Sequence, residues 1–245
     1  MPTVRDMTVG ERAWPTPEIP IATASKDRTA ARIQRLPFQE RSRAVGNEYA
    51  VFQFEPAYEG CCVPVSILNS LTAIYCPMRI SPVVVREIYR NSLDDPQARR
   101  TSSKAIKKIV KRLQQLGSQE GSRTSPRFKC LVKYLIGDEV NLLADGPLCT
   151  ALNQGGSATV LLWYPRNIKH AVAVLRIEQD YVYCFDGRLR TQYRPKNGVE
   201  FLKGPGFCRG ANMRLKREWI DSPDPTRFYG LGPVETREVV IFVPL

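Results

Sequence analysis

The segment TVLLWYPRNIKHAVAVLRIEQDYVYCFD, residues 159–186, indicates the fold class most directly. It contains three runs rich in β-branched, aromatic and other apolar residues, with short turns between them: 159–164, 170–177 and 181–186. Runs of this kind predict consecutive antiparallel strands. The run EVVIFV at 238–243 predicts a last strand, and FKCLVKYL at 128–135 is a further candidate.

Helical patterns come before most of these strands. Apolar spacing, prolines and capping residues predict four helices: 63–75, 81–91, 102–116 and 147–153. Pro77 ends the first helix, and the Ser81 hydroxyl is the expected N-cap of the second. Because helices come first and an antiparallel sheet second, the sequence predicts an α+β fold.

The composition is that of an ordinary globular protein, with 43% hydrophobic and 24% charged residues among 245. Residues 1–47 contain five prolines and no sustained periodicity, which predicts an extended arm ahead of one domain over residues 48–245. No apolar run approaches the roughly 20 residues of a membrane-spanning helix. Charges and prolines stand at the start, where a signal peptide would be apolar. We therefore expect a soluble protein that is not secreted.

The seven cysteines are odd in number and form no C-x-x-C pair. This pattern indicates neither a disulfide framework nor a zinc ribbon. Reduced thiols are the simpler interpretation, in a reducing compartment such as the cytoplasm or the interior of a host cell. His170 is the only histidine, which excludes multi-histidine metal sites, and we expect neither a metal nor a cofactor.

Positive charge is concentrated in one region. The formal net charge is +12, and residues 99–133 alone hold eleven basic residues and one acid. Five of these basic residues lie on the predicted helix 102–116, opposite its apolar stripe: Lys104, Lys107, Lys108, Lys111 and Arg112. They form either a solvated helix face or a patch that binds a polyanion such as nucleic acid. With no base-reading motif nearby, such binding would be directed at phosphates and would weaken in salt.

Three residues far apart in the sequence have the chemistry of a thiol-based catalytic site. Cys62 stands just before the first helix, where unpaired backbone N–H groups and the helix dipole favour the nucleophilic thiolate. His170 opens one predicted strand and Asp186 ends the next, so a hairpin would place imidazole and carboxylate side by side. Two alternatives stay open: Cys61 is a rival nucleophile, and Cys62 could be a thiol that only packs.

The order Cys, His, Asp, with the cysteine at a helix start, resembles that of papain-like cysteine peptidases. The branch most similar to this chain is the bacteriocin-processing (double-glycine) peptidases, in which Cys-Gly-Pro-x-Ser-Leu-x-x-x-Leu opens the helix. Here CVPVSILNSL, residues 62–71, matches at Cys62, Ser66 and Leu71. The features of the family's second half, up to a strand that ends in Asp, recur in residues 146–186.

This resemblance implies a papain-like fold, a polypeptide substrate and a triad of Cys62, His170 and Asp186. It also implies an oxyanion-binding glutamine about six residues before the nucleophile. This sequence has Pro56 at that position, and Gln53 would serve only if the intervening loop bulges. Peptidases, isopeptidases and acyltransferases all use such a triad. A different class of function is a structural subunit that keeps this fold inside a large assembly, such as a ribonucleoprotein or a virion.

Overall fold

The computed structural model describes seven parts of the chain: residues 62–75, 80–92, 100–118, 128–164, 168–188, 198–202 and 210–245. Several predictions from the sequence concern residues outside these parts: the arm 1–47, the domain start at residue 48, Gln53 and Cys61. The described residues form helices and an antiparallel sheet, so the prediction of an α+β structure is confirmed.

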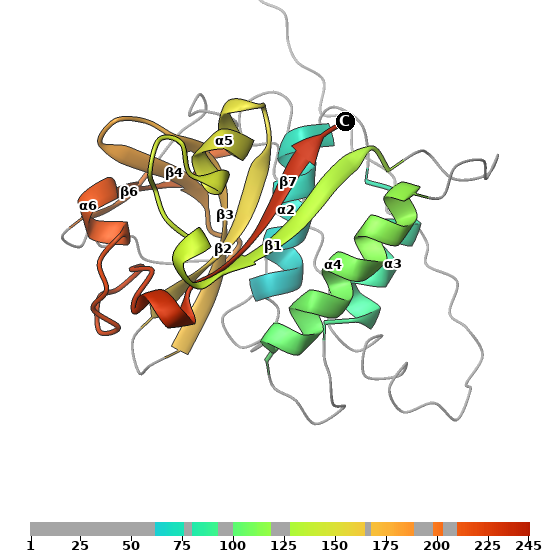
Figure 1. The fold of residues 1–245 in the computed structure, drawn as a ribbon, viewed down its shortest axis with the longest axis horizontal. Helices are drawn as coiled ribbons and strands as arrows, with labels where there is room; N and C mark the ends of the chain where they lie inside the picture. The colour runs from blue at the N-terminus through green and yellow to red at the C-terminus, as the bar shows by residue number, and fades with distance from the viewer. Residues whose placement is uncertain are drawn as a thin grey trace, which may run out of the picture.

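A seven-stranded sheet with strand order β1-β7-β2-β3-β4-β6-β5 lies at the centre of the structure, and its neighbouring strands pair antiparallel (Figure 1). The strands are β1 (Cys130–Ile136), β2 (Ser157–Tyr164), β3 (Ile168–Ile177), β4 (Tyr181–Phe185), β5 (Val199–Phe201), β6 (Met213–Lys216) and β7 (Glu238–Pro244). The five strands predicted from apolar runs are confirmed. The sequence does not predict β5 and β6, because strands of three and four residues show too little alternation.

The four predicted helices are also confirmed: α2 (Cys62–Tyr75), α3 (Pro82–Arg90), α4 (Ser103–Ser118) and α5 (Pro147–Asn153). Three short elements accompany them: η1 (Gly137–Glu139), α6 (Arg217–Ile220) and η3 (Val234–Thr236). Ser81 is the N-cap of α3, since its hydroxyl accepts a hydrogen bond from the backbone N–H of Val83 at 3.4 Å. None of the helices in the described ranges is both long and apolar enough to cross a membrane.

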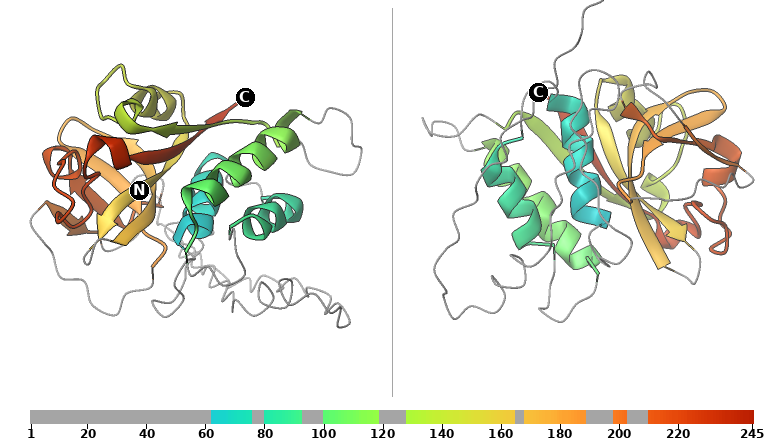
Figure 2. Two further views of the ribbon diagram at one scale, coloured as in Figure 1. Left: turned by 60° about the horizontal axis from the view of Figure 1, so that its bottom comes forward. Right: turned by 180° about the vertical axis from the view of Figure 1, so that it is seen from behind.

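Helices cover both faces of the sheet. On one face, α2 packs against β2, β3 and β7, α4 packs against β1, and α3 lies beside α4. Their apolar sides share a buried cluster with the sheet that includes Ile67, Ile109 and Phe242. On the other face, α5 adds Leu148 and Leu152 to a second cluster. Figures 1 and 2 show α2 and α5 on opposite sides of the sheet, and both helices contact the central strands β2, β3 and β7.

A polar seam fixes the position of α2 along β2. The hydroxyls of Ser70 and Thr159 share a hydrogen bond of 3.0 Å, and Ser66 Oγ donates to the same threonine at 3.4 Å. Ser157 Oγ donates to the Ser70 carbonyl at 2.7 Å. All four side chains are buried, where an unpaired hydroxyl would cost about 1–3 kcal/mol. A slip of α2 along the sheet would break this pairing, so the start of the helix has a fixed place.

Candidate active site

Cys62 is the first residue of α2 and is partly buried. Pro64 lies in the first turn, where its missing N–H removes no helical hydrogen bond. Val63 and Ile67 are buried, so the helix start is held against the sheet. The Cys62 sulfur thereby reaches β3, where it hydrogen-bonds to the side chain of His170 and to the backbone N–H of Ala171.

His170 lies on β3, where its side chain meets both other members of the predicted triad. The sequence prediction places His170 at the start of this strand, but the strand begins two residues earlier, because Ile168 pairs with Tyr164 of β2. The His170 side chain is buried, and its Nε2 lies 2.9 Å from Oδ1 of Asp186. Since Nε2 is engaged by the carboxylate, Nδ1 is the ring nitrogen left for the Cys62 sulfur.

Asp186 directly follows β4, which ends at Phe185 and so stops one residue before its predicted end. The residue is 1% exposed, and both of its carboxylate oxygens have donors. Oδ1 accepts from the backbone N–H of Arg188 at 2.9 Å, and Oδ2 accepts from the Tyr229 hydroxyl. The Asn212 side-chain amide accepts from the Asp186 N–H at 2.8 Å and donates to its carbonyl at 2.9 Å. These bonds favour the ionised carboxylate and fix its orientation.

Tyr229 and Asn212 are the site residues that the sequence analysis does not find. Tyr229 is fully buried and has a left-handed backbone, with φ of 63°, which is uncommon for a residue with a side chain. Backbone hydrogen bonds of 2.7 Å hold this conformation: Tyr229 donates to the Trp163 carbonyl, and Trp163 donates to the Gly230 carbonyl. Gly230 is the one local signal of a turn, and nothing in the sequence connects that turn with Asp186.

Aromatic rings shield the buried ion pair. The ring centroids of Tyr164 and Tyr229 lie 5.3 Å and 6.0 Å from that of the His170 imidazole. Phe228 completes the group, 4.7 Å from Tyr164 and 4.3 Å from Tyr229. By keeping water away, these rings strengthen the attraction between the imidazolium and the carboxylate of Asp186.

This environment favours a thiolate beside an imidazolium. Burial by itself raises the pKa of the Cys62 thiol, but the hydrogen bond and positive charge of His170 outweigh burial, and the pKa is lowered. Burial by itself lowers the pKa of His170, but the charge and hydrogen bond of Asp186 raise it to about 10. Both shifts favour the state in which the imidazole holds the shared proton.

The other cysteines in the described parts of the chain behave in the opposite way. Burial raises the pKa of the Cys130 thiol to about 12. Burial also raises the pKa of Cys149 and, together with the charge of Asp186, that of Cys184. Among these four thiols, only Cys62 has a lowered pKa, so Cys62 forms the nucleophilic thiolate most readily.

The remaining predicted residues lie away from this constellation or outside the described parts. The basic side chains of α4 are all exposed: Lys104, Lys107, Lys108, Lys111 and Arg112. The role of Gln53 in an oxyanion hole stays a prediction. Within the described ranges, no group of three or more His, Cys, Asp and Glu side chains could hold a metal ion.

No model of a protein family matches the chain, and no curated protein matches it. The resemblance to papain-like peptidases thus depends on the motif 62–71 and on the three residues that the fold brings together.

Proposed function

We propose that this protein is a thiol hydrolase of papain-like architecture, most simply a cysteine peptidase that cleaves peptide or isopeptide bonds. The observation that carries the proposal is a thiol of lowered pKa, Cys62, hydrogen-bonded to an imidazole that a buried carboxylate orients. The packing of the nucleophile helix α2 on the strand that carries His170 supports the papain-like architecture.

In the first step, the Cys62 thiolate attacks the carbonyl carbon of the substrate. A C–S bond forms as the carbonyl π electrons move to oxygen. Backbone N–H groups in the first turn of α2 have no helical partner and are the expected donors to this oxyanion. The His170 imidazolium then gives its proton to the leaving amine as the C–N bond breaks, which leaves a thioester on Cys62 and a neutral imidazole.

In the second step, water hydrolyses the thioester. Neutral His170 takes a proton from the water molecule, whose oxygen attacks the thioester carbonyl. The C–S bond then breaks, the acid product leaves, and the thiolate and imidazolium are restored. Asp186 stays ionised and holds Nε2, so that Nδ1 keeps facing the sulfur. An amine in place of water would give acyl transfer by the same residues.

The pH dependence of thiol alkylation tests this proposal. The full chain is treated with limiting iodoacetamide over a pH series, and labelling of each cysteine is measured by mass spectrometry. Cys62 should be labelled ahead of Cys130, Cys149 and Cys184 at neutral pH, because only the thiolate reacts.

His170→Ala is the matched control. Without the imidazole, burial governs the pKa of Cys62, and its labelling at neutral pH should fall to the level of the other buried thiols. Hydrolysis is then measured on a mixed peptide library, with Cys62→Ala as the blank. If Cys62 is labelled no faster than Cys130, the hydrolase proposal is wrong and a structural subunit becomes the better interpretation.

A further inference from the structure

Helix α4 has an exposed side that consists of cations and neutral polar groups. Its basic residues stand three or four positions apart, on one side of the helix: Lys104, Lys107, Lys108, Lys111 and Arg112. The opposite side, with Ile106, Ile109 and Leu113, is fully buried in the cluster between the helices and the sheet. The five basic residues are called the α4 basic face below.

Carboxylates neutralise only part of this charge in the described structure. The sequence of α4, SKAIKKIVKRLQQLGS, contains no acidic residue. Arg112 is paired, since its Nε lies 2.8 Å from Oε2 of Glu87 on α3. Lys104, Lys107 and Lys111 have no carboxylate partner in the parts of the chain that the structure describes.

The charges of this face oppose the helix that carries them. Lys107 has one lysine three residues before it and another four residues after it, and like charges at these spacings destabilise a helix. Lys104 lies in the first turn, where the helix dipole disfavours a cation. An anion bound across the face would neutralise these unfavourable charges, so the arrangement fits a ligand of high negative charge.

We infer that the α4 basic face binds the phosphate backbone of nucleic acid without reading its sequence. Lysine ammonium groups are compact point charges that suit phosphate. The rise along the helix from Lys104 to Lys111 is about 10 Å, and phosphates recur about every 3.4 Å along each strand of a duplex. Helix α4 itself contains no aromatic residue on which bases could stack.

A membrane surface fits the same face less well. Helices that lie on membranes insert apolar side chains below the lipid headgroups. The large apolar side chains of α4 are instead committed to the protein core or packed against it. Electrostatic attraction would then be the sole contribution to lipid binding, whereas a duplex presents a denser row of charges.

The test is the binding of a mixed-sequence DNA duplex of about 20 base pairs to the full chain. The chain carries Cys62→Ala, so that the proposed hydrolysis of peptide bonds plays no part in the measurement. Four phosphate contacts predict a slope of about 3.6 for log Kd against log salt, which is a weakening of roughly 150-fold between about 50 and 200 mM salt. The variant K104Q/K107Q/K108Q/K111Q should lose this part of the slope together with the corresponding affinity.

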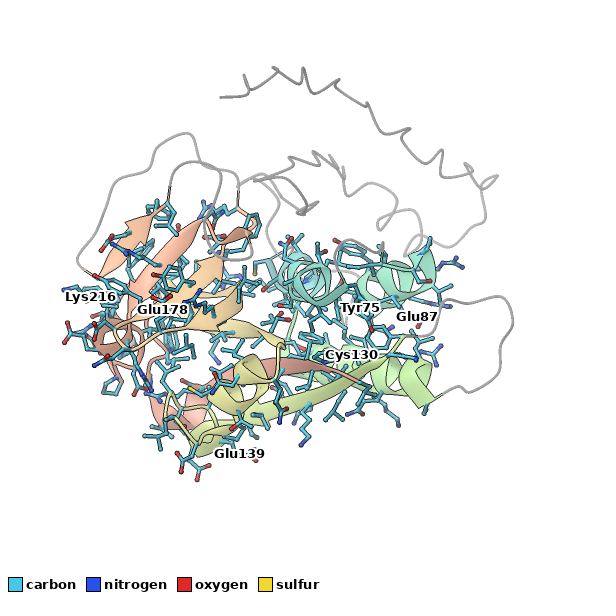
Figure 3. The ribbon with its side chains drawn as sticks, turned by 90° about the horizontal axis from the view of Figure 1, so that it is seen from above. Tyr75, Glu87, Cys130, Glu139, Glu178 and Lys216 are labelled. Carbon is cyan, nitrogen blue, oxygen red and sulfur yellow. The ribbon has the colours of Figure 1, made fainter. Side chains whose placement is uncertain are left out.

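Replacing the same four lysines by arginine keeps the charge and should keep the binding. A second control is Lys216→Gln. Figure 3 shows Lys216 at the opposite end of the molecule from Glu87, which pairs with Arg112 of the basic face, so this change should weaken binding less than Lys111→Gln does. Unchanged affinity and slope in the glutamine variant would overturn the inference. Equal loss in the arginine variant, or tighter binding of polyglutamate or anionic vesicles than of the duplex, would overturn it as well.

Discussion

The candidate active site and the α4 basic face use charged groups in opposite ways. In the site, His170 and Asp186 are both buried, and His170 Nε2 lies 2.9 Å from Asp186 Oδ1. Both oxygens of the carboxylate accept hydrogen bonds. On the α4 basic face, the cations are exposed and stand beside other cations. Burial makes an unpaired charge costly, whereas water and salt screen like charges at a surface.

The removal of a charge should therefore have opposite consequences in the two regions. In the site, it leaves a buried partner uncompensated and disturbs the proton positions on which the proposed chemistry depends. At Lys111 on the α4 basic face, it relieves repulsion and leaves the fold more stable, at the expense of anion binding. Substitutions in each region test this difference.

The largest effect is expected from the loss of the sulfur. Cys62→Ala should lower the turnover of peptide hydrolysis by about 10⁶-fold, as the loss of a nucleophile does in comparable sites. The double variant Cys62→Ala/His170→Ala should be hardly worse, because the two residues act as one unit. Turnover is measured on a substrate from the library, with circular dichroism as the check on folding.

Cys61→Ala is the matched control for this prediction and should keep full activity. The opposite pattern, an inactive Cys61→Ala beside an active Cys62→Ala, would move the nucleophile by one residue. The Cys62–His170 contact in the structure would then have no catalytic role.

Asp186→Asn should come next, with turnover about 10⁴-fold lower. Asparagine keeps the shape of the side chain but removes the charge that raises the pKa of His170 to about 10. With Asp186 present, the imidazolium persists until the pH rises through about 10, so activity should decline only there. Without the carboxylate, burial lowers the pKa of His170, and the alkaline limb of the pH–rate profile should move to lower pH. An alkaline limb that stays in place would show that Asp186 does not control the charge of the imidazole.

The parts of the fold that local chemistry determines could be predicted from the sequence. The Ser81 hydroxyl caps α3 by accepting a hydrogen bond from the nearby backbone N–H of Val83. The apolar spacing of α2 and α4 corresponds to their buried sides. The short strands β5 and β6 could not be predicted, because their residues join the sheet only through pairing with distant partners.

The residues of the candidate site also fall into those that the sequence could predict and those that it could not. Cys62, His170 and Asp186 could be proposed because a helix start and one hairpin determine where they lie. Tyr229 could not, because its left-handed backbone depends on hydrogen bonds with Trp163, 66 residues earlier in the chain. The long-range partners of a buried charge are invisible in the sequence, whereas the spacing of the exposed basic residues on α4 is visible in it directly.

Tyr229→Phe tests whether this long-range partner matters. A hydrogen bond to a charged group contributes about 1.5–3 kcal/mol, so turnover should fall roughly 10- to 100-fold. The alkaline limb should also shift, since the hydroxyl donates to Asp186 and holds the carboxylate in place. Tyr164→Phe is the control, because its hydroxyl accepts from Arg188 at 2.7 Å and lies in the same aromatic group. Equal effects from the two variants would make Tyr229 a packing residue only.

The smallest effect, and the one of opposite sign, is expected on the α4 basic face. Lys111 has like-charged neighbours at Lys107 and Lys108, and each such pair costs about 0.2–0.5 kcal/mol. Lys111→Gln should therefore raise the free energy of unfolding by about 0.4–1 kcal/mol at low salt, and urea titration can measure the change. The gain should vanish in high salt, where repulsion is already screened. Lys216→Gln removes the same charge at the far end of the molecule and should leave the free energy of unfolding nearly unchanged. A loss of stability in Lys111→Gln would mean that these lysines support the fold, and the contrast between the two regions would disappear.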